Sequence, residues 1–142
     1  MSEGGVKTVL VAEGLSDSRM FMRMALEGHG YRVVEAETGE AAVEAALRER
    51  PDLVLMDLHL PGLGGLEATR RIRGHEGLRD VPVVGTSVLD TPEIEAEALA
   101  AGCTAFRRQP IDFDKFGEVA DLILRRPGAR AEPGGPGKGG KE

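Results

Sequence analysis

The sequence predicts one α/β domain with a parallel sheet, and two observations carry this prediction. Short apolar runs alternate with longer stretches of helical period along most of the chain, as expected for repeated βα units. Two of these runs, LVLM at 53–56 and VPVV at 81–84, are almost wholly apolar, which indicates strands covered on both faces. We therefore expect five strands and five helices arranged in layers around one core.

The predicted strands are short, and each precedes a predicted helix. Their ranges are Thr8–Ala12, Arg32–Glu35, Leu53–Met56, Val81–Gly85 and Thr104–Phe106.

Capping residues and glycines mark the first two helices. Ser16 or Asp17 can cap the first helix, and Gly28 with Gly30 can end it, because glycine readily leaves the helical conformation. Thr38 can cap the second helix, and Pro51 closes that segment. The residues expected to face the core are Met20, Phe21 and Met24 in the first helix, and Val43, Ala46 and Leu47 in the second.

The remaining helices have equally local signals. The third is expected from Gly65 or Leu66 to about Arg73, after the loop LPGLG. The fourth begins at Thr91-Pro92, a cap followed by a proline whose missing N–H has no cost at that position. The fifth runs from about Asp112 to about Arg125.

Length and composition set the domain organisation. The 142 residues suffice for one domain with one sizeable core. The segment PGARAEPGGPGKGGKE consists mostly of Gly, Pro and charged residues, which bury too little apolar area to offset the entropy of ordering. We expect one domain over residues 1–126 and a flexible tail over 127–142.

Charge and cysteine content narrow the class of protein. A net charge of −6 and only 4% aromatic residues argue against direct nucleic-acid binding. Cys103 is the only cysteine, so the chain cannot build a disulfide framework, and we expect Cys103 to be a small buried residue. The sequence shows neither a signal peptide nor an apolar run of membrane-spanning length, so a cytoplasmic location is expected.

Polar residues follow four of the predicted strands. Glu13 follows the first, Asp57 the third, Ser87 the fourth, and Gln109-Pro110 the fifth. Ligands of open parallel sheets bind beyond the carboxyl ends of the strands. These residues are therefore the candidates for a functional site.

The chain resembles the receiver domain of two-component response regulators. The matching stretches are VLVAEGLSDSRMFMRMALE, PDLVLMDLHLPGLGGLEATRRIR, VPVVGTS and AGCTAFRRQPIDF, so the resemblance covers roughly residues 6–125. It implies a flavodoxin-like, doubly wound parallel sheet of strand order 2-1-3-4-5.

The resemblance also implies roles for the strand-end residues. Asp57 is expected to accept a phosphoryl group from a sensor histidine kinase. Glu13, Asp57 and the backbone carbonyl of His59 are expected to hold Mg²⁺. Ser87 would hydrogen-bond the phosphoryl oxygen, Phe106 would reorient with it, and Gln109 stands where the family has a lysine.

Two positions depart from the family pattern. Gly14 stands where a second metal-binding acid is expected, and Gln109 carries no charge. A site with two carboxylates binds Mg²⁺ more weakly than one with three. The two changes offset each other in the charge of the empty pocket. Three carboxylates and one lysine would sum to −2, and Glu13 and Asp57 alone also sum to −2. We therefore hypothesise that the pocket is stable without metal or phosphoryl group.

Several alternatives stay open at this point. Thr86 takes the place of Ser87 if the strand register shifts by one residue. Arg107 or Arg108 can supply the missing cation by reaching over the pocket, although a solvated pair is favoured. His59, beside two carboxylates, can serve as a counter-charge or remain a solvated loop residue.

Two functions compete. One is a phosphorelay receiver that is not an enzyme beyond its own phosphorylation. The other is a phosphorylation-independent pseudo-receiver that binds signalling partners through the fourth helix, fifth strand and fifth helix, a face that can also form a homodimer. A magnesium-dependent phosphohydrolase is disfavoured, because no second acid lies two residues after Asp57. The residues expected on the partner-binding face are Glu93, Glu95, Glu97, Phe106, Lys115 and Glu118.

Overall fold

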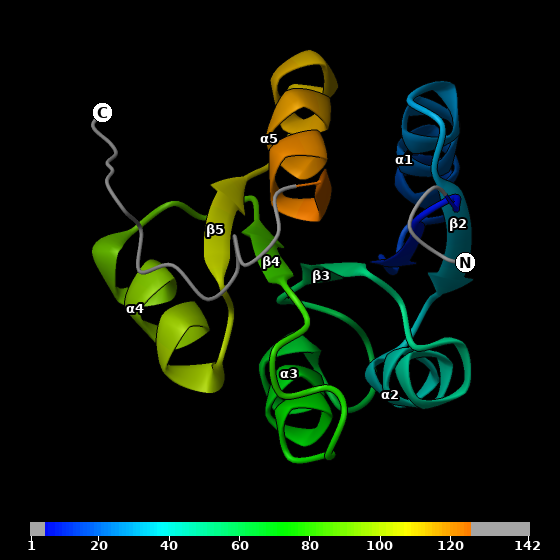
Figure 1. Cartoon of the computed structure of the whole chain (residues 1–142). Coiled ribbons are helices and arrows are strands. Elements are labelled where there is room, and N and C mark those ends of the chain that lie inside the picture. Colours follow the sequence, from blue (N-terminus) through cyan, green and yellow to red (C-terminus); the bar gives the residue numbers. More distant parts are fainter. Residues whose placement is uncertain (1–4, 126–142) are drawn as a thin grey trace.

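Strands and helices alternate along the whole described chain. Figure 1 shows the computed structural model, which describes residues 5–125. Over these residues there are five strands and five helices: β1 (Thr8–Ala12), α1 (Ser16–Gly28), β2 (Arg32–Ala36), α2 (Gly39–Glu49), β3 (Leu53–Asp57), α3 (Gly65–Arg73), β4 (Val83–Ser87), α4 (Pro92–Ala101), β5 (Ala105–Arg108) and α5 (Phe113–Arg125). The predicted tail, 127–142, lies outside the described residues.

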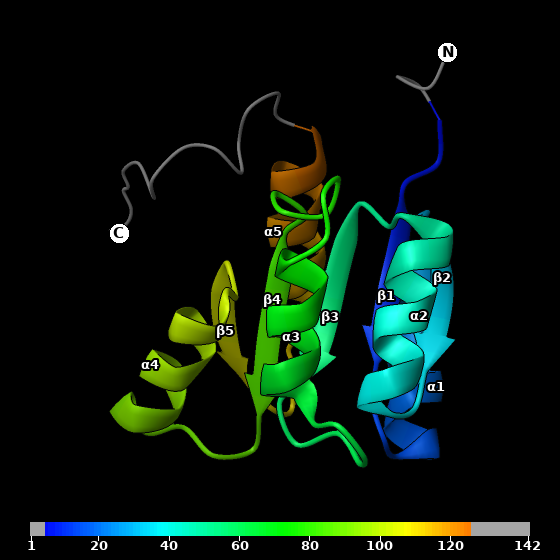
Figure 2. The same cartoon turned by 90° about the horizontal axis from the view of Figure 1, so that it is seen from below.

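The strands form one parallel sheet in the order β2-β1-β3-β4-β5, as predicted. Figure 2 shows the strands side by side, with their carboxyl ends at the same edge. The order reverses at β1, which pairs with β2 on one side and with β3 on the other. A ligand site is therefore expected beside the end of β1.

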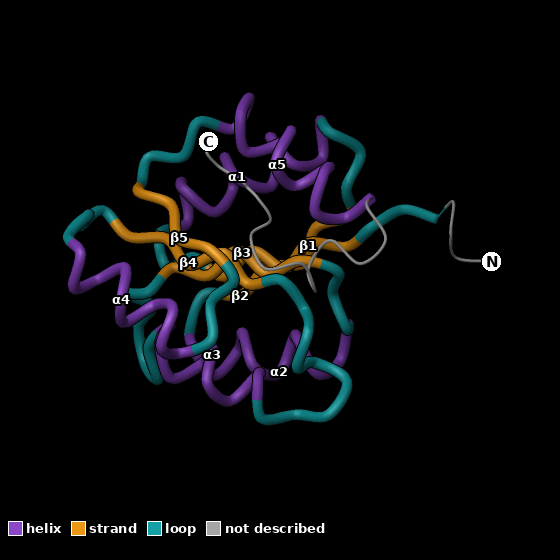
Figure 3. The backbone as a smooth tube through the Cα atoms, turned by 60° about the vertical axis from the view of Figure 1, so that its left-hand side comes forward, coloured by secondary structure: helices purple, strands orange, loops and turns teal. Residues whose placement is uncertain are grey.

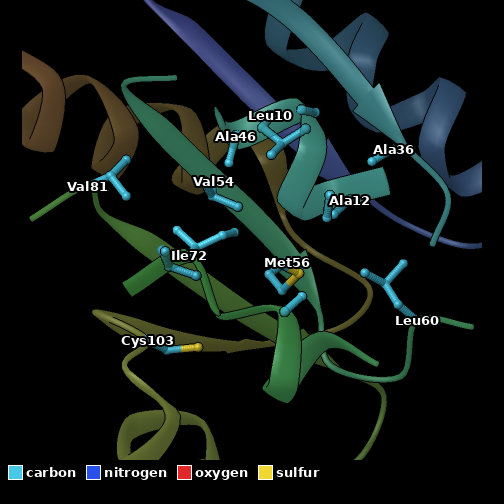
Figure 4. Packing of buried hydrophobic residues seen from close by; sticks show 14 of the residues in the cluster. Leu10, Ala12, Ala36, Ala46, Val54, Met56, Leu60, Ile72, Val81 and Cys103 are labelled. Carbon is cyan, nitrogen blue, oxygen red and sulfur yellow. The ribbon is translucent and has the colours of Figure 1, made fainter. Parts of the chain in front are cut away.

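Helices cover both faces of the sheet. In Figure 3, α1 and α5 lie on one side of the strands, and α2, α3 and α4 lie on the other. Successive residues of a strand point to opposite faces, so Leu10 and Val54 belong to the core under α2, α3 and α4. Val9 and Leu53 belong to the core under α1 and α5. Figure 4 shows the first of these cores, with Cys103 buried at its margin, as predicted.

Two of the predicted helix caps are confirmed and one is wrong. The Thr38 hydroxyl accepts the Ala41 N–H at 3.1 Å, and the Thr91 hydroxyl accepts the Ile94 N–H at 3.2 Å. Helix α1 instead includes Ser16 as its first residue, follows Leu15 and has no side-chain cap. The apolar side chain of Leu15 offers no acceptor to the first helical N–H groups.

The predicted core-facing side of α1 is also wrong. Met20, Phe21 and Met24 are exposed, whereas Met22 and Leu26 are buried. The run MFMRM places apolar residues on opposite sides of one helical turn, so helical period alone does not choose between the two faces. The Phe21 ring makes an edge contact with Phe113 of α5, with 6.1 Å between ring centroids.

The later strands begin further along the chain than predicted. Strand β4 begins at Val83 rather than Val81, and β5 begins at Ala105 rather than Thr104. Leu78 and Val81 are buried although they precede β4. The apolar character of Val81 therefore reflects burial in the core and not strand structure. Strands β3 and β4 also end further along the chain than predicted, so Asp57 and Ser87 are the last residues of these strands rather than residues that follow them.

Candidate functional site

A pocket of about 310 Å³ lies at the carboxyl ends of the strands. It brings together four of the predicted site residues, and Gly14, Leu15, Pro61 and Val88 complete its lining. The predicted site residues in the lining are Glu13, Asp57, His59 and Gln109. The reversal of strand order at β1 places this pocket where an open α/β sheet has its ligand site.

Asp57 is held at the end of β3 by the neighbouring strand and by its own loop. It pairs in register with Thr86 of β4, and its Oδ1 accepts the backbone N–H of His59 at 2.9 Å. The chain then passes very close to itself: a Cβ at position 65 would lie 2.1 Å from the Asp57 carbonyl oxygen. Glycine at 65 therefore lets α3 begin directly against the backbone of Asp57 and Leu58.

Glu13, directly after β1, is almost fully buried, with 2% of its surface exposed. Its Oε2 accepts the Leu15 N–H at 3.1 Å, and its Oε1 accepts the Gln109 side-chain amide at 3.3 Å. Burial raises the pKa of the Glu13 carboxyl, and the negative charge of Asp57 raises it further, while the bonds from Leu15 and Gln109 lower it. Two carboxylates that repel each other in this way create a place for a cation.

Gly14 contributes backbone but no ligand atom from a side chain. A Cβ at this position would lie 2.9 Å from Cδ of Pro61 and 3.3 Å from its Cγ. The ring of Pro61 thus packs where a side chain on residue 14 would begin.

Thr86 and Ser87 are both buried, and their hydroxyls have different partners. The Thr86 Oγ1 accepts the Gln109 amide at 2.8 Å. The Ser87 Oγ accepts the Leu89 N–H at 2.9 Å and shares a 2.8 Å hydrogen bond with Nε2 of His59. Ser87 is fully buried and is not part of the pocket lining, so its bond to His59 is its link to the pocket. Thr86, which pairs in register with Asp57, supports Gln109.

Gln109 joins the ends of three strands. Its backbone N–H donates to the Ser87 carbonyl at 2.8 Å, and its side-chain amide donates to both Glu13 and Thr86. The amide has two hydrogens, so these two bonds use its full donor capacity. Gln109 therefore fills its place in the pocket with hydrogen bonds and without charge.

Three residues considered for the site lie away from this pocket. Phe106 is half-buried against the core under α2, α3 and α4. Arg107 and Arg108 are exposed and line a separate pocket of about 160 Å³ with Lys115 and Phe116. Within residues 5–125, no lysine or arginine lines the pocket of Asp57.

The sequence did not predict the hydrogen bonds of His59 to Ser87 and of Gln109 to Thr86. A local signal for the first was present, because His59 lies between Leu58 and Leu60. Both leucines are buried, which turns the intervening side chain toward the pocket. The partner of that side chain depends on the alignment of β3 with β4, which local sequence does not encode.

The residues present fit a magnesium ion held by two carboxylates. Glu13 and Asp57 line the same pocket and interact electrostatically. The His59 carbonyl belongs to the loop that joins Asp57 to Pro61. Among the described residues, no group of three or more His, Cys, Asp or Glu side chains is arranged to hold a metal. Mg²⁺ needs only one or two protein carboxylates when waters and phosphate oxygens complete its shell, so the site fits a weakly held ion.

Comparisons with known proteins identify the family of the chain. Residues 9–121 match the family model of the response regulator receiver domain. The polar-differentiation response regulator DivK of Brucella anthropi is 31% identical over 118 residues, which make up 83% of this chain and 96% of the relative. The DivK protein of Brucella ovis is also 31% identical over 118 residues, again 83% of this chain and 96% of the relative.

Solved structures show the same fold. The receiver domain of a sensor histidine kinase from Pseudomonas aeruginosa superposes with a TM-score of 0.80 at 28% identity, covering 86% of this chain and 100% of that one. That structure has a magnesium ion coordinated in its active-site cleft. The chemotaxis protein CheY4 of Vibrio cholerae superposes with a TM-score of 0.80 at 22% identity, over 84% of this chain and 100% of that one, and supports the fold alone.

No helix in the described part of the chain is long and apolar enough to cross a membrane.

The family match spans most of the chain, and the fold and the position of the pocket agree with it. The chain therefore belongs to the response regulator receiver domain family, whose members are signalling modules of two-component phosphorelays.

Proposed function

We propose that this receiver domain accepts a phosphoryl group on Asp57 from a phosphohistidine of a sensor histidine kinase. An Asp57 carboxylate oxygen forms a bond to phosphorus while the bond from phosphorus to the histidine nitrogen breaks. The electron pair of that broken bond stays on the imidazole, and the product is an acyl phosphate. The observation that supports this role most strongly is the position of Asp57, at the end of β3 and in the lining of the strand-end pocket.

Glu13, Asp57 and the backbone carbonyl of His59 are the groups that would hold Mg²⁺ in this pocket. When bound, the ion would offset the negative charge that spreads over the phosphoryl oxygens during transfer. Ser87 lies beside the site through its bond to His59, which supports a role in binding the phosphoryl oxygen. Phe106 on β5 is proposed to reorient when Ser87 moves.

The pocket is proposed to be an atypical one, adapted to the state without metal and without phosphoryl group. Gly14 stands at the position of a family acid, and Gln109 at the position of a family lysine. The Gln109 amide donates to Glu13 and Thr86 together, and its bond to Glu13 opposes the rise in the Glu13 pKa that burial and the Asp57 charge cause. This donor reduces the electrostatic cost of an empty pocket that contains two acids.

Output by protein contact is favoured over direct binding to DNA. The match covers 96% of the DivK relative, so a receiver domain alone accounts for nearly all of that protein. We propose that α4, β5 and α5 form the surface for a downstream signalling protein or a second copy of the chain, because exposed acidic and basic side chains both lie there. Its exposed charged residues include Glu93, Glu95, Glu97, Arg107, Arg108, Lys115 and Glu118.

The acceptor role is tested by incubating the full chain with acetyl phosphate and excess Mg²⁺ and measuring the intact mass. The wild type is expected to gain one phosphoryl group, and Asp57→Asn is expected to gain none. If neither protein is labelled while both unfold cooperatively, the acceptor role is wrong. A partner whose binding is unchanged by Asp57→Ala would then support the phosphorylation-independent alternative.

A further inference from the structure

The backbone of His59 is anchored beside the end of β4 by its neighbours in sequence. Leu58 and Leu60 are buried, with 6% and 4% of their surfaces exposed. The Leu58 N–H donates to the Thr86 carbonyl at 2.9 Å, which continues the pairing of β3 with β4 by one residue. The backbone on both sides of His59 is therefore anchored, and its imidazole lies next to Ser87.

The Ser87 hydroxyl is occupied in this structure. Ser87 is fully buried, and its Oγ already bonds the Leu89 N–H and the His59 Nε2. A hydroxyl offers one hydrogen and two lone pairs. A third partner therefore has to take the one capacity that remains, or replace one of the two existing partners.

His59 also contacts Asp57, since its backbone N–H donates to the Asp57 Oδ1 at 2.9 Å. One residue thus bonds the carboxyl through its backbone and the Ser87 hydroxyl through its ring. A phosphoryl group on Asp57 that is to reach Ser87 enters the space next to this ring. The phosphoryl oxygen can only accept, so it competes with the tautomer of His59 whose Nε2 accepts the single Ser87 hydroxyl hydrogen.

We propose that His59 is a positioning residue that competes with the phosphoryl group for the Ser87 hydroxyl and so holds the resting conformation. This inference rests on the proposed acceptor role of Asp57. His59 is exposed, so its ring can turn into solvent without opening a cavity in the core. The resting conformation has one neutral hydrogen bond that the phosphorylated one lacks. This bond favours the resting conformation roughly three- to tenfold.

The hydrogen bond itself is tested in the unphosphorylated protein by NMR of the imidazole nitrogens in alkaline buffer. A bond to Ser87 fixes one tautomer of His59. We expect one dominant tautomer in the wild type and a mixture in Ser87→Ala, while the signals of His29 and His75 stay unchanged. The same mixture in both proteins would overturn the inference.

The competition between His59 and the phosphoryl group is tested by measuring the affinity for beryllofluoride, a phosphoryl mimic, at saturating Mg²⁺. His59→Ala is expected to bind it roughly three- to tenfold more tightly than the wild type. His59→Gln, whose amide can reach the position of Nε2, is expected to stay near the wild type. In the Ser87→Ala background, His59→Ala should have no further effect, and His75→Ala serves as the matched control on an exposed histidine.

The outcomes separate the two proposals. Unchanged or weaker binding by His59→Ala, or the same gain in the Ser87→Ala background, overturns the competition. If no variant binds beryllofluoride and none is labelled by acetyl phosphate, the acceptor role of Asp57 fails and the competition fails with it. The NMR result then still decides whether His59 positions Ser87.

Discussion

The two walls of the strand-end pocket differ in how they are built. The acceptor wall, formed by Asp57 and His59 with the buried Ser87 behind His59, is connected by hydrogen bonds of 2.8 and 2.9 Å. The metal wall, formed by Glu13, Gly14 and Gln109, has one carboxylate, a residue without a side chain and a neutral amide. In the proposed atypical pocket, the hydrogen-bonded frame is kept while the charges proposed to bind metal and phosphoryl group are reduced.

The largest effect is expected from rebuilding the metal wall in the double variant Gly14→Asp with Gln109→Lys. This change adds a carboxylate for Mg²⁺ and a cation for the phosphoryl oxygens, and it leaves the formal charge of the pocket unchanged. We expect the rate of labelling of Asp57 by acetyl phosphate to rise about tenfold or more.

Intact mass over time at low millimolar Mg²⁺ provides this rate. Gln109→Lys alone is the control, because it leaves only two carboxylates for the metal. Its labelling rate should increase less than that of the double variant. A double variant no faster than the wild type would show that the metal wall does not limit the reaction.

Gly14→Asp alone is expected to destabilise the protein in EDTA. Its Cβ meets the Pro61 ring at 2.9 Å, and its charge adds to those of Glu13 and Asp57. The combined loss should be about 1–3 kcal/mol of unfolding free energy, measured by urea denaturation, and Mg²⁺ should recover part of it.

Gly14→Asn separates the two causes, since it makes the same contact without the charge. If the asparagine variant loses as much stability as the aspartate variant, repulsion between carboxylates is not the reason for the loss.

A smaller effect is expected from Thr86→Val, which removes the acceptor of the 2.8 Å bond from Gln109. One hydrogen bond of this kind contributes about 1 kcal/mol, so the unfolding free energy should fall by about that amount. A double-mutant cycle with Gln109→Ala measures the coupling. Strict additivity of the two substitutions would mean that the bond does not stabilise the metal wall.

The smallest effect is a pH dependence in the absence of metal. The pKa of Glu13 is raised in the folded protein, so the folded state binds a proton more tightly than the unfolded state. The contribution of Glu13 to stability is then fully present below its unfolded pKa and is lost as the pH rises through the folded pKa. In Glu13→Gln this loss should disappear.

The difference in melting temperature between the wild type and Glu13→Gln, followed from acidic to neutral pH in EDTA, measures the effect. The melting temperature of Glu13→Gln should increase relative to that of the wild type as the pH rises. A difference that does not vary with pH would show that Glu13 titrates as an exposed carboxyl does.

Local signals predicted much of the fold, and the errors lie where local signals conflict. The caps Thr38 and Thr91 and the apolar run of β3 act within a few residues, so sequence alone located those elements. The burial of Met22 rather than Phe21 depends on how α1 packs against the sheet and α5. Tertiary packing decides such cases, because helical period fits both faces.

The candidate site divides in the same way. Asp57, Glu13 and Gln109 were predicted because parallel strands end at a common edge and the resemblance assigned roles to those positions. The ring of His59 on Ser87 and the amide of Gln109 on Thr86 connect residues 28 and 23 positions apart. Contacts of that range depend on strand register and side-chain conformation, which only the structure defines.

The central claim is that Asp57 accepts a phosphoryl group with a metal held by only two carboxylates, and its most direct test is a magnesium titration of acetyl phosphate labelling. We predict that the labelled fraction of the wild type rises gradually over the millimolar range, and that the Asp57→Asn control stays unlabelled throughout. Full labelling in EDTA, or saturation at micromolar Mg²⁺, would contradict the two-carboxylate site. A wild type that stays unlabelled at every magnesium concentration would contradict the acceptor role itself.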